Sequence, residues 1–259
     1  MSRIASAFAH GKAFIPFLTC GDPDLETTER ILCAMAQAGA DLIELGIPFS
    51  DPTAEGPVIQ SANIRALAAG TTTDKIFDLV RRVREKIAVP MVFMTYANVV
   101  YSYGIERFAQ RSAEVGMDGV ILPDVPFEEK EEFAPAFRAR GLDFISLVAP
   151  TSRDRVQKIA QAAEGFVYCV SSLGVTGMRR EIGAAAGALA ADVRSHANIP
   201  AAIGFGISTP AQAADMAQYA DGVIVGSAIV KLVAEHGTGA APYVADYVRA
   251  MKDALKHAE

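Results

Sequence analysis

The stretch DLIELGIPFSDPTAEGP, residues 41–57, sets an acidic side chain inside an apolar run that is typical of a packed strand. Glu44 lies within this run, and Asp51 and Glu55 follow on a loop that is rich in proline and glycine. Because burying an unpaired carboxylate costs several kcal/mol, an acid in such a position usually has a chemical role. A structural acid paired with a buried polar group is the alternative.

The alternation of side chains along a strand fixes where Glu44 points. If Leu42 faces the interior of a barrel, Glu44 faces it too, near the C-terminal mouth, whereas Ile43 and Leu45 pack against helices. An apolar surround raises the pKa of a carboxyl group, which suits Glu44 to exchange protons near neutral pH. We therefore expect Glu44 to be catalytic.

The loop after this strand is open to two interpretations. Asp51-Pro52 is also typical of an ordinary turn, and a solvated Glu55 would need no function. However, a long loop that carries acids beside a buried acid also suits a lid that supplies a second proton acceptor.

Glycine-rich segments follow the last three apolar runs of the chain. Glycine lets backbone N–H groups approach an anion closely, and a helix N-terminus adds a favourable dipole. The loops after strands seven and eight are the usual phosphate site of a TIM barrel. One such segment is also found in ordinary turns, but three at successive strand ends favour a phosphorylated ligand. The segments are SSLGVTG (171–177), GFGIST (204–209) and GSAIVK (226–231).

Several residue types are missing from the expected strand ends. No lysine lies there, which argues against a Schiff-base aldolase and against bound pyridoxal phosphate. The four histidines are far from these ends, so no metal-ligand set is expected. Carboxylate acid–base chemistry on a phosphorylated substrate, without metal or cofactor, remains. The histidines are His10, His196, His236 and His257.

The composition is that of a globular protein with a large core. The 259 residues are 51% hydrophobic and 21% charged, and the net charge of −6 argues against a nucleic acid or a membrane surface as the main partner. We find no membrane span or signal segment, and the cysteines Cys20, Cys33 and Cys169 show no CxxC spacing, so we expect buried thiols in a cytoplasmic protein.

Short apolar runs alternate with longer amphipathic ones, which predicts eight βα units. Nearly continuous apolarity is expected of strands that are covered on both faces. We predict an α/β fold, a TIM (β/α)8 barrel formed by one domain over residues 1–259, with a doubly wound sheet as the alternative. The predicted strands are 14–19, 42–46, 91–95, 119–123, 144–148, 166–170, 201–205 and 222–226.

The segments between these runs are helical in pattern. Thr209 and Pro210 are typical of an N-cap and a first helical position. Additional helices are expected before the first strand, between the second and third strands, and at the C-terminus. The predicted helices are 2–9, 27–39, 58–70, 73–87, 106–116, 131–141, 209–220 and 241–257.

Five motifs in this order resemble the tryptophan synthase alpha chain family over nearly the whole length. The loop motif after the second strand is highly specific, whereas the glycine motifs also suit other phosphate-binding barrels. The resemblance implies retro-aldol cleavage of indole-3-glycerol phosphate to indole and glyceraldehyde 3-phosphate. The motifs are PFLTCGDPD, DLIELGIPFSDPTAEGPVIQ, SLGVTG, GFGIS and GVIVGSAIVK.

The resemblance also implies a role for each site residue. Glu44 matches the family's general acid–base, and Glu55 matches the loop acid that accepts a hydrogen bond from the indole N–H. Tyr168 would lie beside Glu44, and Phe17 would form a wall of the indole pocket. The phosphate would be held by Gly177, Gly206, Gly226 and Ser227, and Thr176 would close over the site and contact the loop acid.

Four positions depart from the family pattern. Glu55 stands where the family has Asp, which shifts the carboxylate by one methylene. Ser172 replaces a common Arg, Thr53 a common Leu, and Val99 a usual Pro. The changes at 53, 55 and 172 concern the geometry of loop closure, and the change at 99 concerns a surface that faces the family's partner.

That partner, by resemblance, is the pyridoxal-phosphate-dependent beta chain in an αββα complex. Four residues match contact positions: Pro48, Asp51, Asn98 and Pro126. Three alternatives remain. They are a stand-alone lyase that releases free indole, an impaired barrel that survives as an activator of the beta chain, and a different phosphate-binding barrel isomerase, which would lack ELGIPFSDP.

Overall fold

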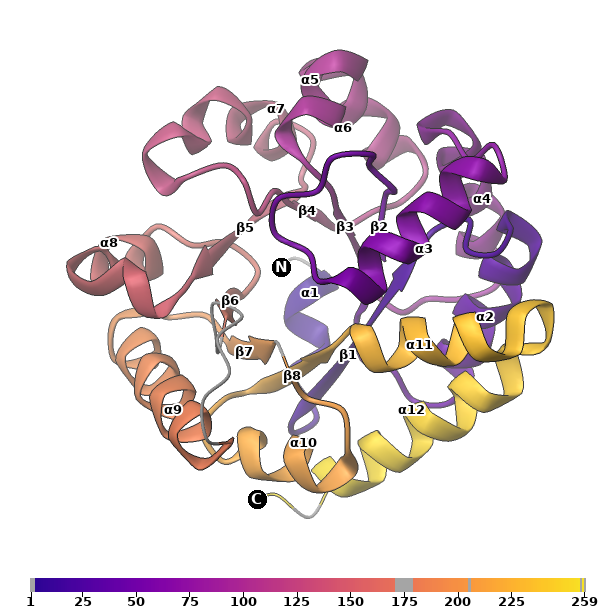
Figure 1. The fold of residues 1–259 in the computed structure, drawn as a ribbon. Coiled ribbons are helices and arrows are strands. Elements are labelled where there is room, and N and C mark those ends of the chain that lie inside the picture. The colour runs from indigo at the N-terminus through magenta and orange to yellow at the C-terminus, as the bar shows by residue number, and fades with distance from the viewer. Residues whose placement is uncertain (1–2, 171–178, 205, 257, 259) are drawn as a thin grey trace.

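A computed structural model describes residues 3–170, 179–204, 206–256 and 258 of the chain. Eight parallel strands pair in chain order, and the sheet closes where β8 pairs with β1 (Figure 1). The TIM barrel is confirmed, and the doubly wound alternative is wrong. The strands are β1 (Ala13–Thr19), β2 (Ile43–Gly46), β3 (Met91–Met94), β4 (Gly119–Ile121), β5 (Asp143–Val148), β6 (Val167–Val170), β7 (Ala201–Gly204) and β8 (Gly222–Val225).

Helices surround the strands as an outer ring (Figure 1). The expected helix between the second and third strands is present as α3, and the C-terminal helix as α12. The helices are α1 (Arg3–Ser6), α2 (Leu25–Gln37), α3 (Pro57–Ala68), α4 (Thr73–Arg84), α5 (Ala97–Tyr103), α6 (Ile105–Glu114), α7 (Ala134–Arg138), α8 (Val156–Gln161), α9 (Arg179–His196), α10 (Pro210–Ala217), α11 (Ser227–His236) and α12 (Ala241–Leu255), with short 3₁₀ helices η1 (Phe127–Glu132), η2 (Pro150–Arg155) and η3 (Gly237–Gly239).

The core has two main layers. Side chains inside the barrel form one cluster, which includes Leu42, Val92 and Ile224. Ile43 and Leu45 belong instead to the larger cluster between the strands and the helices. The predicted alternation along β2 is therefore confirmed, and it directs Glu44 into the barrel.

The N-terminal helix closes one end of the barrel. Ile4 and Ala7 are buried in the interior cluster, and α1 lies behind the strands in the centre of the view (Figure 1). Regular helix ends at Ser6, earlier than predicted. Beyond it the amides bond three residues back, as in Phe8 N–H to Ala5 O and Ala9 N–H to Ser6 O, so the chain tightens into turns.

Local signals explain most of the other helix boundaries. Thr209 caps α10 through a capping box with Gln212, and Pro210 occupies the first turn, as predicted. The predicted helix at 131–141 is wrong in its bounds. A 3₁₀ helix, η1, covers its start, and α7 begins only at Ala134 with Pro135 in its first turn, since proline cannot donate to an earlier carbonyl.

The described residues contain no helix with the length and apolarity that crossing a membrane requires.

Candidate active site

Glu44 is buried in β2 near the C-terminal end of the barrel. It pairs in register with Phe17 of β1 and Val92 of β3, and only 1% of its surface is exposed. Neither carboxyl oxygen has a hydrogen-bond partner in the described part of the chain. Burial raises the pKa of Glu44 from its usual 4.5 to about 8, and the negative charge of Glu55 adds to the shift. Glu44 therefore holds a proton at neutral pH and can exchange it.

Tyr168 lies on β6 and reaches the neighbourhood of Glu44. Burial, and then the charge of Glu44, raise the pKa of Tyr168 well above its ordinary value, so the phenol keeps its proton. A Cβ on Gly204 of β7 would lie 2.5 Å from the Tyr168 hydroxyl. Gly204 thus makes room for the phenol, a role that its place in a glycine motif did not predict.

Phe17 forms a wall at the same end of the barrel. It is 4% exposed and packs against Ala62 of α3 and Val230 of α11. A Cβ on Gly46 would lie 2.6 Å from the tip of the Phe17 ring, and one on Gly226 would lie 3.4 Å from the ring. The aromatic ring therefore occupies the space that a side chain at Gly46 would fill, and it lies within contact distance of Gly226. Sequence reasoning missed the contribution of Gly46.

Glu55 is anchored on the loop between β2 and α3. Its Oε2 accepts a hydrogen bond of 2.6 Å from Asn63 Nδ2, and its backbone oxygen accepts one of 2.7 Å from Gln60. The Tyr96 hydroxyl also bonds the carboxylate and accepts from the Ala54 N–H at 3.1 Å. Burial raises the pKa of Glu55, and the bonds from Asn63 and Tyr96 partly oppose this. Glu55 is half-buried, so the interpretation as a solvated residue is wrong.

Sequence reasoning missed Asn63 and Tyr96, although each had a signal. Asn63 is a polar residue on the buried face of α3 and is 3% exposed. Tyr96 follows β3 at its C-terminal end, where functional side chains of a barrel gather. Phe49 packs on Tyr96 with 5.3 Å between the ring centroids, which ties a second point of the same loop to Tyr96.

A cavity of about 590 Å³ opens at the C-terminal ends of β3 to β6. Its walls are mostly apolar, and Glu55 and Tyr168 are among its polar groups. A mostly apolar cavity with few polar groups is typical of a small-molecule site. Glu44 is sealed from solvent beside Tyr168. The walls include Met94, Leu122, Phe144, Leu147, Val148 and Val170.

The predicted phosphate residues are partly described. Gly226 is the N-cap of α11, and Ser227 is its first, exposed residue, so the free N–H groups of this helix start close to Phe17. Gly206 is exposed with φ +77°, a conformation that favours glycine. Thr176 and Gly177 lie outside the described residues, as does Ser172.

The four predicted partner positions differ in exposure. Asp51 is exposed and accepts a 2.5 Å hydrogen bond from Ser50, and Asn98 is exposed on α5. Pro126 is exposed and borders the cavity. Pro48 is buried, so it supports the loop from within and offers little surface to another chain.

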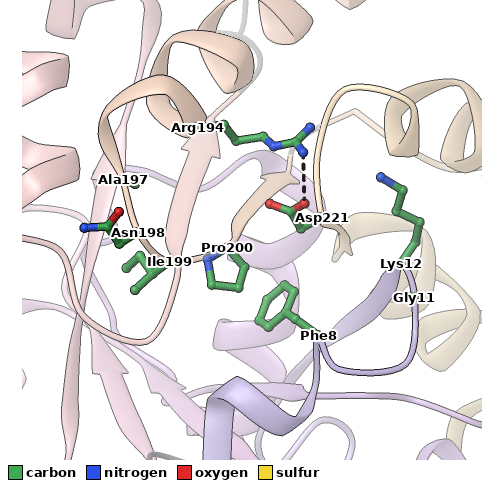
Figure 2. A pocket seen from close by; sticks show the side chains of 9 residues that line it. All are labelled: Phe8, Gly11, Lys12, Arg194, Ala197, Asn198, Ile199, Pro200 and Asp221. Atoms are coloured by element: carbon green, nitrogen blue, oxygen red, sulfur yellow. Dashed lines mark ion pairs between the residues drawn. The ribbon is translucent and has the colours of Figure 1, made fainter.

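A second cavity, of about 580 Å³, is lined by residues that precede β1, β7 and β8, at the N-terminal ends of these strands. Figure 2 shows these side chains. Arg194 Nη2 lies 3.6 Å from Asp221 Oδ1, and the other oxygen of Asp221 accepts from the Ala201 N–H. Lys12 Nζ donates to the Ala220 carbonyl oxygen. These charged groups hold the loops that lead into β1, β7 and β8, which is typical of the stabilising end of this fold.

The described residues contain no group of three or more His, Cys, Asp or Glu side chains that could hold a metal ion. All three cysteines are free thiols, and burial raises the pKa of Cys20 and of Cys169 to about 12.

Comparisons with known proteins agree with this geometry. Residues 5–258 match the family model described as tryptophan synthase alpha chain. The alpha chain of Lacticaseibacillus casei is 48% identical over 255 residues, which are 98% of this chain and 96% of that protein. The crystal structure of the alpha subunit from Legionella pneumophila superposes with a TM-score of 0.90 at 36% identity and covers 99% of both chains.

An assembled relative is similar too. A structure of the tryptophan synthase α2β2 complex from Pyrococcus furiosus matches with a TM-score of 0.88 at 36% identity, over 94% of this chain and 98% of that one. Both the sequence and the barrel with its buried acid thus lead to the same assignment. The chain belongs to the tryptophan synthase alpha chain family.

Proposed function

We propose that Glu44, Glu55 and Tyr168 carry out the lyase reaction of this family, the cleavage of indole-3-glycerol phosphate to indole and glyceraldehyde 3-phosphate. One observation carries the proposal. Glu44 is a fully buried acid whose two oxygens have no partner among the described residues, and its pKa is raised to about 8. Such a group can donate and accept a proton within one catalytic cycle.

The carbon–carbon bond breaks only if its electrons have somewhere to go. Glu44 donates its proton to C3 of the indole, which makes the ring an iminium-like electron sink. The resulting carboxylate then takes the proton of the alcohol on the neighbouring carbon. The C–C bond electrons return to the ring, the alcohol becomes an aldehyde, and Glu44 regains its proton.

Glu55 stabilises the charge that this protonation creates. Its carboxylate accepts a hydrogen bond from the indole N–H, which becomes more acidic as the ring becomes positive. The bonds from Asn63 and Tyr96 hold the longer glutamate side chain in one position before substrate arrives. Tyr168 packs beside Glu44 and keeps the site dry, and Phe17 forms the wall that the indole ring contacts.

The phosphate binds at the N-terminus of α11. The N–H groups of its first turn, beginning at Gly226 and Ser227, provide donors and a favourable dipole. Gly206 and Gly177 are expected to complete the phosphate site, and Thr176 to close over the site and contact Glu55. None of these steps needs a cofactor bound to this chain. Pyridoxal phosphate belongs to the beta chain of the family, and we place the protein in the cytoplasm.

The beta chain binds over the same end of the barrel. The solved Pyrococcus furiosus relative is part of an α2β2 complex, and we propose the same assembly here. Asp51, Asn98 and Pro126 offer exposed surface around the cavity mouth, and Pro48 supports the loop beneath them.

Release of glyceraldehyde 3-phosphate from indole-3-glycerol phosphate tests the proposal, measured with and without a tryptophan synthase beta chain. We expect slow release by the chain alone and a strong rise with the beta chain, and we expect Glu44→Gln to abolish release while leaving phosphate-ligand binding intact. Fast release by the chain alone would indicate a free-indole lyase. Acceleration of the beta chain's reaction without any release would indicate an activator that has lost catalysis.

A further inference from the structure

Thr19 at the end of β1 carries a buried hydroxyl that the steps above leave unused. The residue is 0% exposed, and its Oγ1 has no hydrogen-bond partner in the described part of the chain. Ile15 and Phe17 of the same strand face the barrel interior, whereas Leu18 and Cys20 face the helices. Thr19 lies two residues after Phe17, and side chains alternate along a strand. Its side chain therefore points into the barrel, as those of Ile15 and Phe17 do, at the C-terminal end.

The register puts Thr19 next to the catalytic acid. Phe17 is opposite Glu44 on β2, and Thr19 is opposite Gly46, one inward position closer to the mouth. Gly46 carries no side chain, and the tip of the Phe17 ring lies against it, beside both polar groups. Thr19 and Glu44 are both buried and both unpaired, so they do not bond each other in this structure. A third group with a donor and an acceptor could satisfy both.

The unpaired hydroxyl is costly in the free protein. A buried polar group without a partner destabilises the folded state, because it has lost its hydrogen bonds to water. Valine has nearly the shape of threonine and would avoid this cost. An alcohol of a substrate that lies against the Phe17 ring can donate its proton to Glu44 and accept a hydrogen bond from Thr19.

We propose that Thr19 is a further catalytic residue, whose hydroxyl donates a hydrogen bond to the oxygen of the alcohol that Glu44 deprotonates. This inference rests on the proposed function. The proton of the alcohol moves to Glu44, the C–C bond electrons return to the indole ring, and the alcohol oxygen becomes the aldehyde oxygen. Thr19 keeps its own proton throughout. Its bond stabilises the negative charge that the oxygen carries as its proton leaves.

Thr95 provides a matched control. Its hydroxyl is also buried, at 1% exposure, and is also without a partner among the described residues. It has the parity of Phe93, which faces the helices, so it points away from the reacting atoms. Thr95→Val therefore reports what removing a buried unpaired hydroxyl does when no catalytic role is lost.

The test compares Thr19→Val, Thr19→Ser and Thr95→Val with the unaltered chain in the presence of the beta chain. Removing one transition-state donor lowers kcat by about 100-fold or more, so we expect a loss of this order in Thr19→Val. The thermal midpoint of Thr19→Val should not fall below that of the unaltered chain. Thr19→Ser should keep kcat within a few-fold of normal, and Thr95→Val should have normal kcat.

A binding measurement separates catalysis from packing. An analogue with a plain propyl chain in place of the glycerol lacks the reacting alcohol, so Thr19→Val should bind it as tightly as the unaltered chain. Near-normal kcat in Thr19→Val, an equal loss in Thr19→Ser, or weaker analogue binding would each overturn the proposal. If the unaltered chain releases no product even with the beta chain, the proposed function itself fails, which is a different result.

Discussion

Replacing Glu44 by glutamine should make the protein more stable while it removes activity. Glu44 ionises at about 8 in the folded chain and near 4.5 when exposed, so folding at neutral pH requires proton uptake. The contribution of Glu44 to the free energy of unfolding is fully present below pH 4.5 and is lost as the pH rises toward 8. From pH 4.5 to pH 7 the free energy of unfolding falls by about 1.36 kcal/mol per pH unit over about 2.5 units, which amounts to about 3 kcal/mol.

Glutamine is neutral at every pH and avoids this loss. Thermal unfolding at pH 5, 7 and 9 measures the effect. At pH 7 we expect the thermal midpoint of Glu44→Gln to be higher than that of the unaltered chain by about 10 °C for a chain of this size. This difference in midpoint should become smaller toward pH 5. Glu132→Gln, at an exposed position of η1, is the control and should leave the midpoint unchanged. A difference in midpoint between Glu44→Gln and the unaltered chain that does not depend on pH would refute the idea that burial raises the pKa of Glu44.

Three further predictions concern the site. First, kcat/KM should fall as the pH rises through about 8, where Glu44 loses its proton. In Glu55→Gln this fall should begin at lower pH, because the negative charge that helps to raise the pKa of Glu44 is gone. Second, Asn63→Ala removes the 2.6 Å bond to Glu55 from a buried position, so steady-state kinetics should show kcat/KM reduced about tenfold, and the thermal midpoint should fall by a few degrees. Third, Gly204→Ala puts a Cβ 2.5 Å from the Tyr168 hydroxyl, and we expect loss of activity with the barrel retained by circular dichroism; normal activity would show that the phenol position is unimportant.

The barrel was predictable because its signal is local. Each strand is a short apolar run, and the alternation along 42–45 already assigned Glu44 to the interior and Ile43 to the helix layer. The predicted strands and the helix at α3 are confirmed within a residue or two. The helix bounds at 131–141 were wrong because η1 ends at Glu132 and α7 begins only at Ala134, with Pro135 in its first turn.

The site was only partly predictable because its contacts are long-range. The Tyr96 hydroxyl meets Ala54 across 42 positions, and no local pattern encodes that approach. Gly46 and Gly204 look like turn or phosphate glycines in the sequence, yet each is small because an aromatic ring from another strand occupies the adjacent space. The burial of Pro48 likewise depends on how the loop folds back, which composition does not fix.

The packing of α1 at one end of the barrel has a consequence for how substrate and products enter and leave the protein. Ile4 and Ala7 pack among the interior side chains at the N-terminal end of the barrel, and the apolar cavity formed by the described residues opens at the C-terminal ends of the strands. A substrate that binds in this cavity, and the products formed from it, would therefore pass the loops at the C-terminal ends of the strands. Indole that passes to another subunit without entering bulk water must cross this rim, so a partner that receives it has to sit over the C-terminal ends of the strands.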